Sequence, residues 1–230
     1  DGPIFPGTWA YNDALQRVNF DAARAQDMLV EAGYVIGAED VTVRAKDGNP
    51  LAFTLIYPDT PEHEQIAQAI QRDWEALQAR VDLEAVPYDV LLNERLANRD
   101  FQAALVDINL ARSPDPDPYP FWDQAQMTGG QNYTQWDNRM ASELLEQARL
   151  TVDLQERVRL YRNFQVLFSQ ESPALPLFYP VYSYAIDQQV QGVSMGPLFD
   201  PSNRFSTLTQ WYLVAKKPAT SATATASPTP

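Results

Sequence analysis

The chain has 230 residues, 45% of them hydrophobic, which is enough apolar material for the core of one large domain or two small ones. Its 30 acidic and 17 basic residues give a formal net charge of −13, which repels nucleic acid and anionic membrane surfaces and argues against both as partners. Because it has no cysteine, the chain forms no disulfide, thiolate metal site or cysteine nucleophile. It lacks a run of about 18 apolar residues that would span a membrane. Residues 1–4 do not have the pattern of a signal peptide, so the route of export stays open.

The first 50 residues predict a linker, a short helix and a hairpin. Residues 1–10 are rich in proline and glycine and have no hydrophobic period, which is typical of an entering linker. Asp21 is expected to cap a helix that Gly33 ends. Asp-Gly-Asn at residues 47–49 is a strong hairpin-turn signal that leads into the next strand.

Residues 51–86 predict a strand, an amphipathic helix and a second strand, a βαβ unit around which the rest of the chain is arranged. Phe53, Leu55 and Tyr57 alternate with smaller or polar neighbours, at the period of a half-buried strand. Thr60 is expected to cap the helix, whose apolar residues recur at the 3.6-residue period. The apolar face of this helix must then lie on a sheet that contains both strands.

The far end of the βαβ unit is a predicted ligand site. Ligands gather beyond the carboxyl ends of parallel strands, which is where Tyr57, Asp59 and Tyr88 are expected to lie. His63, the only histidine, is expected to face solvent in the first turn of the helix. A lone histidine leaves no Ser-His-Asp triad and no histidine-rich metal cluster to build.

Beyond the βαβ unit the chain predicts further parts of an α/β fold. Residues 88–98 predict a helix, and residues 101–110, apolar at nearly every position, predict a central strand. Prolines at alternate positions make residues 111–120 an irregular loop. Two helices capped by Asp137 and Asp153 are expected to pack as a pair.

The last part of the chain is less regular. Residues 174–186 form an apolar, aromatic stretch interrupted by prolines, which predicts an edge strand or a crossing between domains. Residues 188–214 contain scattered apolar residues without an identifiable partner strand. Residues 215–230 consist of Ala, Thr, Ser and Pro with two lysines, and this composition predicts disorder.

Carboxylates in the proline-rich loop are the main candidates for chemistry. Asp115 and Asp117 are spaced to bind a metal ion, yet the loop lacks the glycine and terminal glutamate of an EF-hand, which favours a solvated or capping role. The same pair would act as acid and base in the alternative interpretation, a carboxylate-dependent hydrolase. No dinucleotide- or phosphate-binding motif is present. The chain is therefore predicted to bind no metal or cofactor and not to be an enzyme.

Several short strings occur in an order and spacing that together resemble one family. They are Asn-Phe-Asp-Ala at residues 19–22, Leu-Val-Glu-Ala-Gly-Tyr at 29–34, Asp-Pro-Asp-Pro at 115–118, Gly-Gln-Asn-Tyr at 130–133 and Ser-Pro-Ala-Leu-Pro at 172–176. Over about residues 11–213 the chain resembles the carboxyl-terminal half of the extracellular solute-binding receptors of ABC importers. This is the family of oligopeptide-, dipeptide- and nickel-binding proteins, solute-binding family 5.

The resemblance implies an α/β fold, the carboxyl-terminal lobe of a type II periplasmic-binding-protein-like fold, with a mixed sheet flanked by helices. Residues 1–10 would then be a linker from a first lobe, residues 11–187 the second lobe, residues 188–214 a segment returning to the first lobe, and residues 215–230 the tail. The expected partners are that first lobe, a solute and an ABC permease. The expected location is outside the cytoplasm, in the periplasm or tethered at the cell surface. An uncovered hinge surface also predicts self-association of the chain.

The resemblance further implies which residues line the cleft. They are Tyr57, Asp59, Tyr88, Leu110, Ala111, Arg112, Asp115 and Asn132. Dipeptide receptors of the family resemble one another in having a tryptophan and an amine-binding aspartate where this chain has Ala111 and Pro114. Asp59 or Asp115 remains able to pair with a cationic group. A peptide is the expected solute, with a sugar or another organic solute as an alternative, and a protein-interaction module is a third interpretation of the chain.

Overall fold

The computed structural model describes residues 2–15, 18–37, 42–110, 115–181, 183–196 and 201–214. Predictions that concern Ala111, Arg112, Pro114 and the tail at residues 215–230 lie outside these residues. The chain divides into two units, of which the first comprises residues 1–110 and 115–178 and the second residues 111–114 and 179–230. Within the described part, no helix has the length and apolar character needed to cross a membrane.

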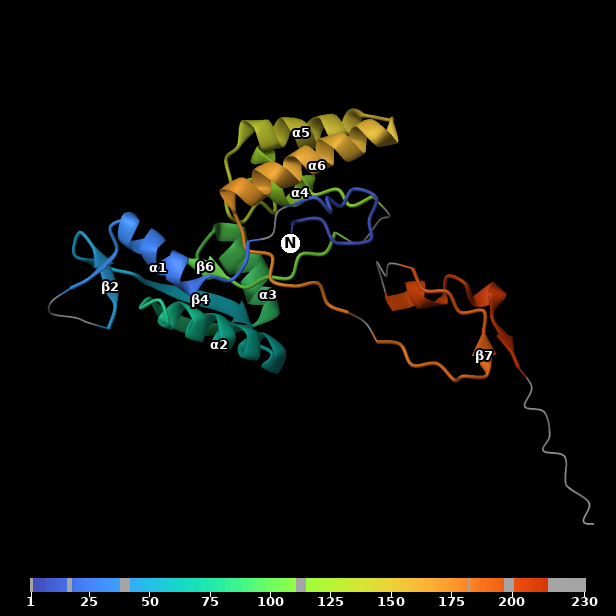
Figure 1. Ribbon diagram of the computed structural model, residues 1–230, viewed down its shortest axis with the longest axis horizontal. Coiled ribbons are helices and arrows are strands. Elements are labelled where there is room, and N and C mark those ends of the chain that lie inside the picture. The colour runs from blue at the N-terminus through green and yellow to red at the C-terminus, as the bar shows by residue number, and fades with distance from the viewer. Residues whose placement is uncertain are drawn as a thin grey trace, which may run out of the picture. The chain divides into compact units, whose positions relative to one another are not determined.

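The first unit contains a sheet region and a helical region, several elements of which are labelled in Figure 1. Its helical segments are α1 (Ala22–Glu31), α2 (Pro61–Glu75), α3 (Tyr88–Val90), the π-helical η1 (Leu91–Leu96), α4 (Tyr119–Trp122), the 3-10 helix η2 (Gln124–Gln126), α5 (Arg139–Leu150) and α6 (Leu154–Glu171). Its strands are β1 (Val35–Ile36), β2 (Arg44–Lys46), β3 (Asn49–Pro50), β4 (Ala52–Pro58), β5 (Arg80–Val86) and β6 (Ala103–Ala104).

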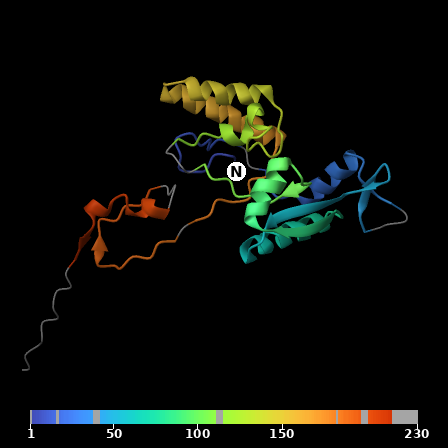
Figure 2. The ribbon, with the colours of Figure 1, turned by 180° about the vertical axis from the view of Figure 1, so that it is seen from behind.

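The sheet region is arranged around β4, which pairs in parallel with β5 on one side and β6 on the other. The chain leaves β4 through α2 to reach β5, then passes through α3 and η1 to reach β6 on the opposite side. Right-handed crossovers in opposite directions place these helical connections on opposite faces of the sheet. Figures 1 and 2 view the sheet and its helices from opposite sides.

Side chains of β4 enter two cores, one on each face of the sheet. Leu55 and Tyr57 pack with Ala67 of α2. Ile56 points to the other face and packs with Leu96 of η1. Because successive strand residues alternate between faces, one strand anchors both helical layers. The predicted βαβ unit is therefore confirmed.

The predicted helix boundaries in this region are also confirmed. The Thr60 hydroxyl oxygen caps α2 by accepting a hydrogen bond from the backbone N–H of His63 at 3.2 Å. The helix expected after β5 is present as α3 and η1. Arg95 of η1 binds Glu84 of β5 at 2.5 Å, and this hydrogen bond holds the pKa of the Glu84 carboxyl below its usual range. This ion pair fixes η1 to the edge of the sheet.

The prediction of a central strand at residues 101–110 is wrong. Within the described residues β4 occupies the middle of the sheet, and β6 pairs with it only at Ala103 and Ala104. The run is apolar because both faces of the sheet are covered: Phe101 packs on the η1 side and Leu105 on the α2 side. Burial on both faces is thus compatible with a place beside the central strand. The three described strands of this sheet are also all parallel, whereas a mixed sheet was predicted.

A small antiparallel sheet of β1, β2 and β3 precedes the parallel sheet. Its turn contains Asp47 and Gly48 at φ angles of 51° and 80°, the left-handed backbone that the predicted hairpin turn requires. Arg44 of β2 is buried, and its guanidinium donates to the carbonyls of Tyr34 and Leu77 at 3.2 and 3.0 Å. Arg44 thus ties this hairpin to the chain that follows α2.

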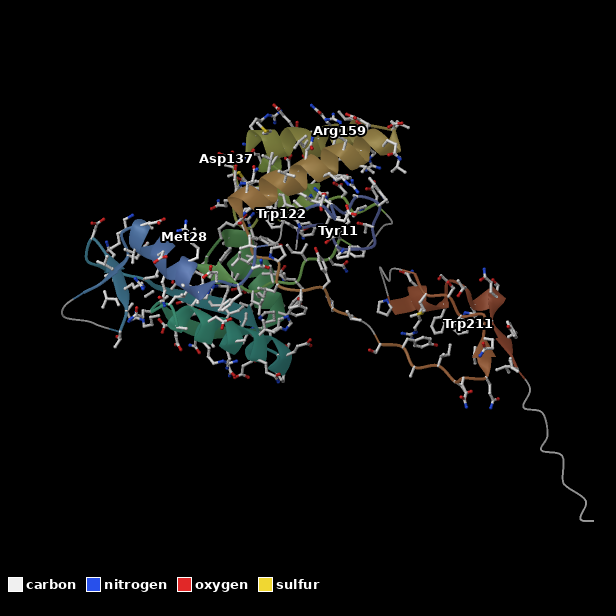
Figure 3. The ribbon with its side chains drawn as sticks, in the orientation of Figure 1. Tyr11, Met28, Trp122, Asp137, Arg159 and Trp211 are labelled. Carbon is white, nitrogen blue, oxygen red and sulfur yellow. The ribbon has the colours of Figure 1, made fainter. Side chains whose placement is uncertain are left out.

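α1 begins and ends as predicted. The Asp21 carboxylate accepts a hydrogen bond from the Arg24 N–H at 2.8 Å, and Gly33 follows the helix at a φ of 92°. None of the residues of α1 is buried. Met28, an apolar residue of this helix labelled in Figure 3, is 55% exposed. The residues at its two ends therefore define this helix, although none of its apolar side chains is buried.

α5 and α6 form the predicted packed pair in the helical region (Figure 1). The core beneath them consists of buried apolar side chains: Ile4, Ala10, Trp122, Trp136, Ala141, Leu145, Ala148, Leu160, Tyr161, Phe164 and Phe168. Trp122, labelled in Figure 3, packs edge-on against Phe168 with ring centroids 4.7 Å apart. Edge-to-face rings of this kind fill a core densely and add to its apolar burial.

Tyr161 carries a polar group into this core. Its side chain is fully buried, and its hydroxyl oxygen accepts a hydrogen bond from Arg157 at 3.3 Å. Burial raises the pKa of the Tyr161 hydroxyl to about 12, and the nearby charges of Asp117 and Asp115 act in the same direction. The fold therefore favours the neutral hydroxyl.

The first residues of the chain also belong to this core. Ile4 and Ala10 are 0% exposed. Gln165 of α6 is equally buried; its amide donates to the carbonyl of Ala10 at 2.9 Å and accepts from the N–H of Asn12 at 3.1 Å. The structure differs here from the predicted linker, because Gln165 supplies backbone partners to a segment that proline and glycine keep from forming regular structure.

The second unit contains β7 (Val190–Gln191), η3 (Pro201–Phe205), η4 (Leu208–Gln210) and β8 (Tyr212–Leu213). β7 pairs with β8 in antiparallel fashion, so residues 188–214 contain a partner strand that the sequence pattern had not revealed. Phe205 lies 6.2 Å from the ring of Tyr184 and 6.1 Å from that of Trp211, labelled in Figure 3. The strand predicted at residues 174–186 is absent from the described part of that range, where prolines remove N–H donors.

Replacing Gln165 with leucine should destabilise the first unit. The substitution leaves the carbonyl of Ala10 and the N–H of Asn12 buried without a partner, at a cost of about 1–3 kcal/mol for each group. We expect the urea midpoint of unfolding, followed by circular dichroism, to fall clearly. Gln170→Leu is a matched control because Gln170 is exposed on the same helix. Equal midpoints for the two variants would contradict the anchoring role of Gln165.

Alkaline unfolding should depend on Tyr161. Because its pKa of about 12 in the fold exceeds the ordinary value of 10.0, its contribution to stability is fully present below pH 10 and is lost as the pH rises to 12. Two pKa units correspond to about 2–3 kcal/mol. Tyr161→Phe should therefore flatten the decline of the unfolding free energy across this range, measured by urea titration at each pH. Tyr88→Phe changes an exposed tyrosine and should keep the wild-type decline; the same decline in both variants would refute the prediction.

Candidate functional site

The carboxyl ends of β4, β5 and β6 meet at one edge of the sheet because the three strands are parallel. Asp59 follows β4, Tyr88 follows β5, and Asp107 lies shortly after β6. The direction in which the chain adds strands to the sheet changes at β4: β5 lies on one side of β4, and β6, the next strand along the chain, lies on the other. In open α/β sheets the crevice at such a switch point is the usual place for a ligand.

A histidine bridges this switch point. The Nε2 of His63, at the start of α2, lies 3.1 Å from Oδ2 of Asp107, and its Nδ1 lies 2.7 Å from the Thr60 hydroxyl oxygen. The His63 side chain is 16% exposed. The prediction that His63 faces solvent is therefore wrong: its side chain is largely buried, and Asp107, 44 positions further along the chain, binds its ring.

The predicted site residues of the sheet region divide into an exposed rim and a buried base. Asp59 is exposed, Tyr88 is half exposed, and Leu110 is partly buried. Tyr57 is only 6% exposed and packs in the core beneath α2. Burial, followed by the charges of Glu64 and Asp59, raises the pKa of the Tyr57 hydroxyl. Tyr57 thus supports the rim from below.

The acids of the proline-rich loop are paired with arginines from the helix pair. Arg157 of α6 binds Asp115 at 2.6 Å, and Arg149 of α5 binds Asp117 at 2.7 Å. Arg149 also stacks on the ring of Tyr119, 3.8 Å from its centroid. The described residues contain no group of three or more side chains suited to hold a metal ion. Each aspartate therefore fastens the loop to the helical region.

Asn132 is fully buried in the loop that precedes α5. Its amide donates to the carbonyls of Asp123 and Trp136 at 3.1 and 3.0 Å. Its oxygen accepts hydrogen bonds from the Trp136 N–H and the Thr134 hydroxyl. Because these bonds use the hydrogen-bonding capacity of the amide, the geometry gives Asn132 a structural role in the loop.

Arg99 is a central residue of this loop that the sequence pattern did not indicate. It follows η1 with a φ of 58°, and its guanidinium donates to the carbonyls of Met127 and Gly130 at 2.9 Å each. It also lies 5.1 Å from the ring centroid of Tyr133. The contacts join positions about 30 residues apart, so no local period or spacing signals them. Arg99 attaches the loop to the end of the helix beside the sheet.

The resulting edge offers groups that can contact a solute. Exposed carboxylates at Asp59 and Asp107 accept hydrogen bonds from N–H groups and pair with cations. The half-exposed ring of Tyr88 offers apolar contact to an organic molecule.

A family model described as bacterial extracellular solute-binding proteins, family 5 Middle, matches residues 1–132. The chain is 26% identical over 197 residues to the dipeptide-binding protein of Escherichia coli (strain K12), a match that covers 85% of this chain and 35% of that protein. It is 25% identical over 202 residues to the heme-binding protein A of Haemophilus influenzae, a match that covers 85% of this chain and 34% of that protein.

Among solved structures, the oligopeptide-binding protein AppA from Bacillus subtilis, in complex with a nonapeptide, matches with a TM-score of 0.74 and 23% identity. The match covers 94% of this chain and 43% of that chain, so this chain spans less than half the length of these relatives. The likeness confirms the predicted fold class, an α/β fold of the type II periplasmic-binding-protein kind. Because the family model covers more than half of the chain, the protein belongs to the bacterial extracellular solute-binding proteins of family 5.

Proposed function

We propose that this chain forms one lobe of the solute-binding component of an ABC importer, which captures a peptide or a similar organic solute and delivers it to a membrane permease. Membership of a family of substrate-binding proteins supports a binding role rather than catalysis. The observation that carries the proposal is the exposed edge at the carboxyl ends of β4, β5 and β6, where Asp59 and Tyr88 face outward.

In this proposal the solute lies against the rim of the sheet. Asp59, Tyr88 and Leu110 contact it, and Ala111 and Arg112, which lie outside the described residues, stay predicted contacts of the solute. The exposed carboxylate binds N–H groups or a cation of the solute, while the tyrosine ring covers an apolar part of it.

Tyr57, Asp115 and Asn132 support this wall indirectly. Tyr57 packs beneath α2, Asp115 pairs with Arg157, and Asn132 bonds within its own loop. A rim fixed from behind in this way loses little freedom when a solute binds, which favours affinity.

The names of relatives favour a peptide and leave room for other organic solutes. One curated relative is named for dipeptides and another for heme. The solved AppA structure holds a nonapeptide. We infer a peptide as the first solute to test, with another organic molecule of similar size as the alternative.

Capture in this proposal works by closure of two lobes around the solute. Residues 11–187 act as one lobe, and residues 188–214 return toward the other. A solute that contacts both lobes binds the closed form more tightly than the open form, and this difference in affinity drives closure. We further propose that the protein acts outside the cytoplasm, in the periplasm or tethered at the cell surface.

The hydrolase alternative is less well supported. Each carboxylate it needs, Asp115 and Asp117, binds an arginine at 2.6 or 2.7 Å. Both carboxylates are thus engaged in ion pairs that fasten the proline-rich loop to the helical region, which gives them a structural role.

The full-length protein should bind peptides, whereas residues 1–230 alone should bind them weakly or not at all. The reason is that one lobe provides only one wall of the cleft, and the exposed lobe should also tend to self-associate. Native mass spectrometry of the full-length protein from its own cells should reveal a retained peptide, and calorimetry should compare both forms. Micromolar peptide binding by residues 1–230 alone would contradict the two-wall proposal, and retention of a solute that is not a peptide would overturn the peptide assignment.

A further inference from the structure

The connection between α5 and α6 presents three apolar side chains to solvent. Leu150, the last residue of α5, is 84% exposed, Val152 is 97% exposed, and Leu154, the first residue of α6, is 49% exposed. We call these three residues the hairpin tip. Figures 1 and 2 both show this connection at the end of the helix pair that lies away from the sheet. Exposed apolar residues that occur together, rather than singly, are typical of an interaction surface.

The polar residues of the same connection hold the tip in one conformation. Thr151 ends α5, because its backbone N–H and its hydroxyl donate to the carbonyl of Gln147 at 3.0 and 2.8 Å. Asp153 caps α6, because its carboxylate accepts from the backbone N–H of Glu156 at 2.8 Å. The polar side chains thus bond to the helix ends, while the apolar ones stay exposed. A tip fixed in this way loses little conformational freedom when it binds a partner.

The exposure of the tip does not result from an incomplete core beneath the helix pair. That core contains buried residues of both helices, such as Leu145 of α5 and Leu160 of α6. Among the described residues, the side chains that pack against this core do not include the three of the tip. The tip is therefore apolar surface in addition to a filled core, and only another molecule can bury it.

Ion pairs flank the tip in the sequence. Arg149 and Arg157 each bind an acid of the proline-rich loop, at 2.7 and 2.6 Å. Arg159, labelled in Figure 3, binds Glu156 at 2.6 Å. These three arginines are thus neutralised by acids of the same chain. An apolar centre with a polar rim is the usual anatomy of a protein interface.

The size of the tip indicates a partner that binds and leaves again. Three aliphatic side chains bury a few hundred Å² at most, whereas stable interfaces bury about 1,200–2,000 Å². This area is too small for a permanent dimer of two copies of the chain. In the proposed function, the partner that the receptor must bind and release in each transport cycle is the permease.

The charge around the tip is also suited to a partner in a membrane. The chain as a whole has a net charge of −13 and is repelled by anionic membrane surfaces. Beside the tip, paired arginines and acids cancel each other's charge at short range. The tip can therefore approach a membrane protein with less repulsion than a surface of unpaired acids would meet.

We propose that the hairpin tip docks the receptor on its permease, by inserting Val152, with Leu150 and Leu154 beside it, into an apolar depression on the extracytoplasmic surface of the permease. The inference deepens the proposed function and rests on it, because it names the surface through which the same receptor meets its permease. A small apolar contact dissociates quickly, so the receptor can leave after it delivers the solute.

The test uses the full-length receptor, purified from its own cells with its retained solute, and the complete importer in lipid nanodiscs. The measured quantity is the receptor concentration that gives half-maximal stimulation of ATP hydrolysis by the importer. Native mass spectrometry measures the retained solute of each variant, and urea unfolding measures its stability. Both should equal the wild-type values, because substitutions at exposed positions leave the core intact.

Substitutions at the tip should weaken docking alone. Val152→Asp should raise the half-maximal concentration about tenfold or more, because it places a charge in an apolar contact. Val152→Ile keeps the tip apolar and should stay within about twofold of wild type. Met140→Ser is the matched control, since Met140 is exposed on the same helix about 15 Å from Leu150 and should have no effect.

Each failure has its own signature. If the wild-type receptor does not stimulate ATP hydrolysis, the proposed role in ABC import fails and the inference falls with it. If the wild-type receptor stimulates but Val152→Asp requires the same concentration, the inference is overturned while the proposed function stands. The inference is also overturned if Val152→Asp loses its retained solute, or if it only dissociates a receptor dimer in sedimentation velocity and leaves stimulation unchanged.

Discussion

The fold depends on the burial of β4 on both faces at once. Leu55 faces α2 and Ile56 faces η1, so the loss of either helical layer would expose one side of the central strand. Burial of apolar surface stabilises the fold by about 25 cal/mol for each Å² removed from water. A strand covered on both faces buries the side chains of both faces, so its burial stabilises the fold more than that of a strand covered on one face. The same arrangement keeps β5 and β6 parallel to β4 and brings their carboxyl ends to one edge. The position of the candidate site therefore follows from the packing of the core.

Arginines connect the sheet region and the helical region of the first unit to the loops. Arg99 donates to carbonyls of the loop before α5, while Arg149 and Arg157 bind the acids of the proline-rich loop. Loops rich in proline and glycine leave backbone and carboxylate groups without regular partners, and the planar guanidinium satisfies several at a time. With 17 basic residues against 30 acidic ones, this use of arginine leaves some described acids elsewhere without a lysine or arginine partner. The carboxylates Asp59 and Asp107 at the edge of the sheet are examples.

Features that depend on neighbours in the sequence could be predicted. Asp21 and Thr60 cap their helices as expected, because a cap bonds to an N–H only three residues away. The turn at Asp47 and Gly48 adopts the expected left-handed backbone. The apolar period of the βαβ unit also specified which side of α2 meets the sheet. Asp59 and Tyr88 were placed at the rim for the same reason, since each directly follows a strand.

The sequence by itself thus determined α1, α2, α5, α6 and the helix after β5, the hairpin turn, the βαβ unit and the family to which the chain belongs. Only the tertiary structure decided that β4 is the central strand, that Asn132 is buried within its loop, and that His63 binds Asp107. The physical reason is distance along the chain. An apolar run of residues predicts that a strand is buried, but it does not predict the place of that strand in the sheet. A polar side chain likewise does not indicate which distant residue will become its hydrogen-bond partner.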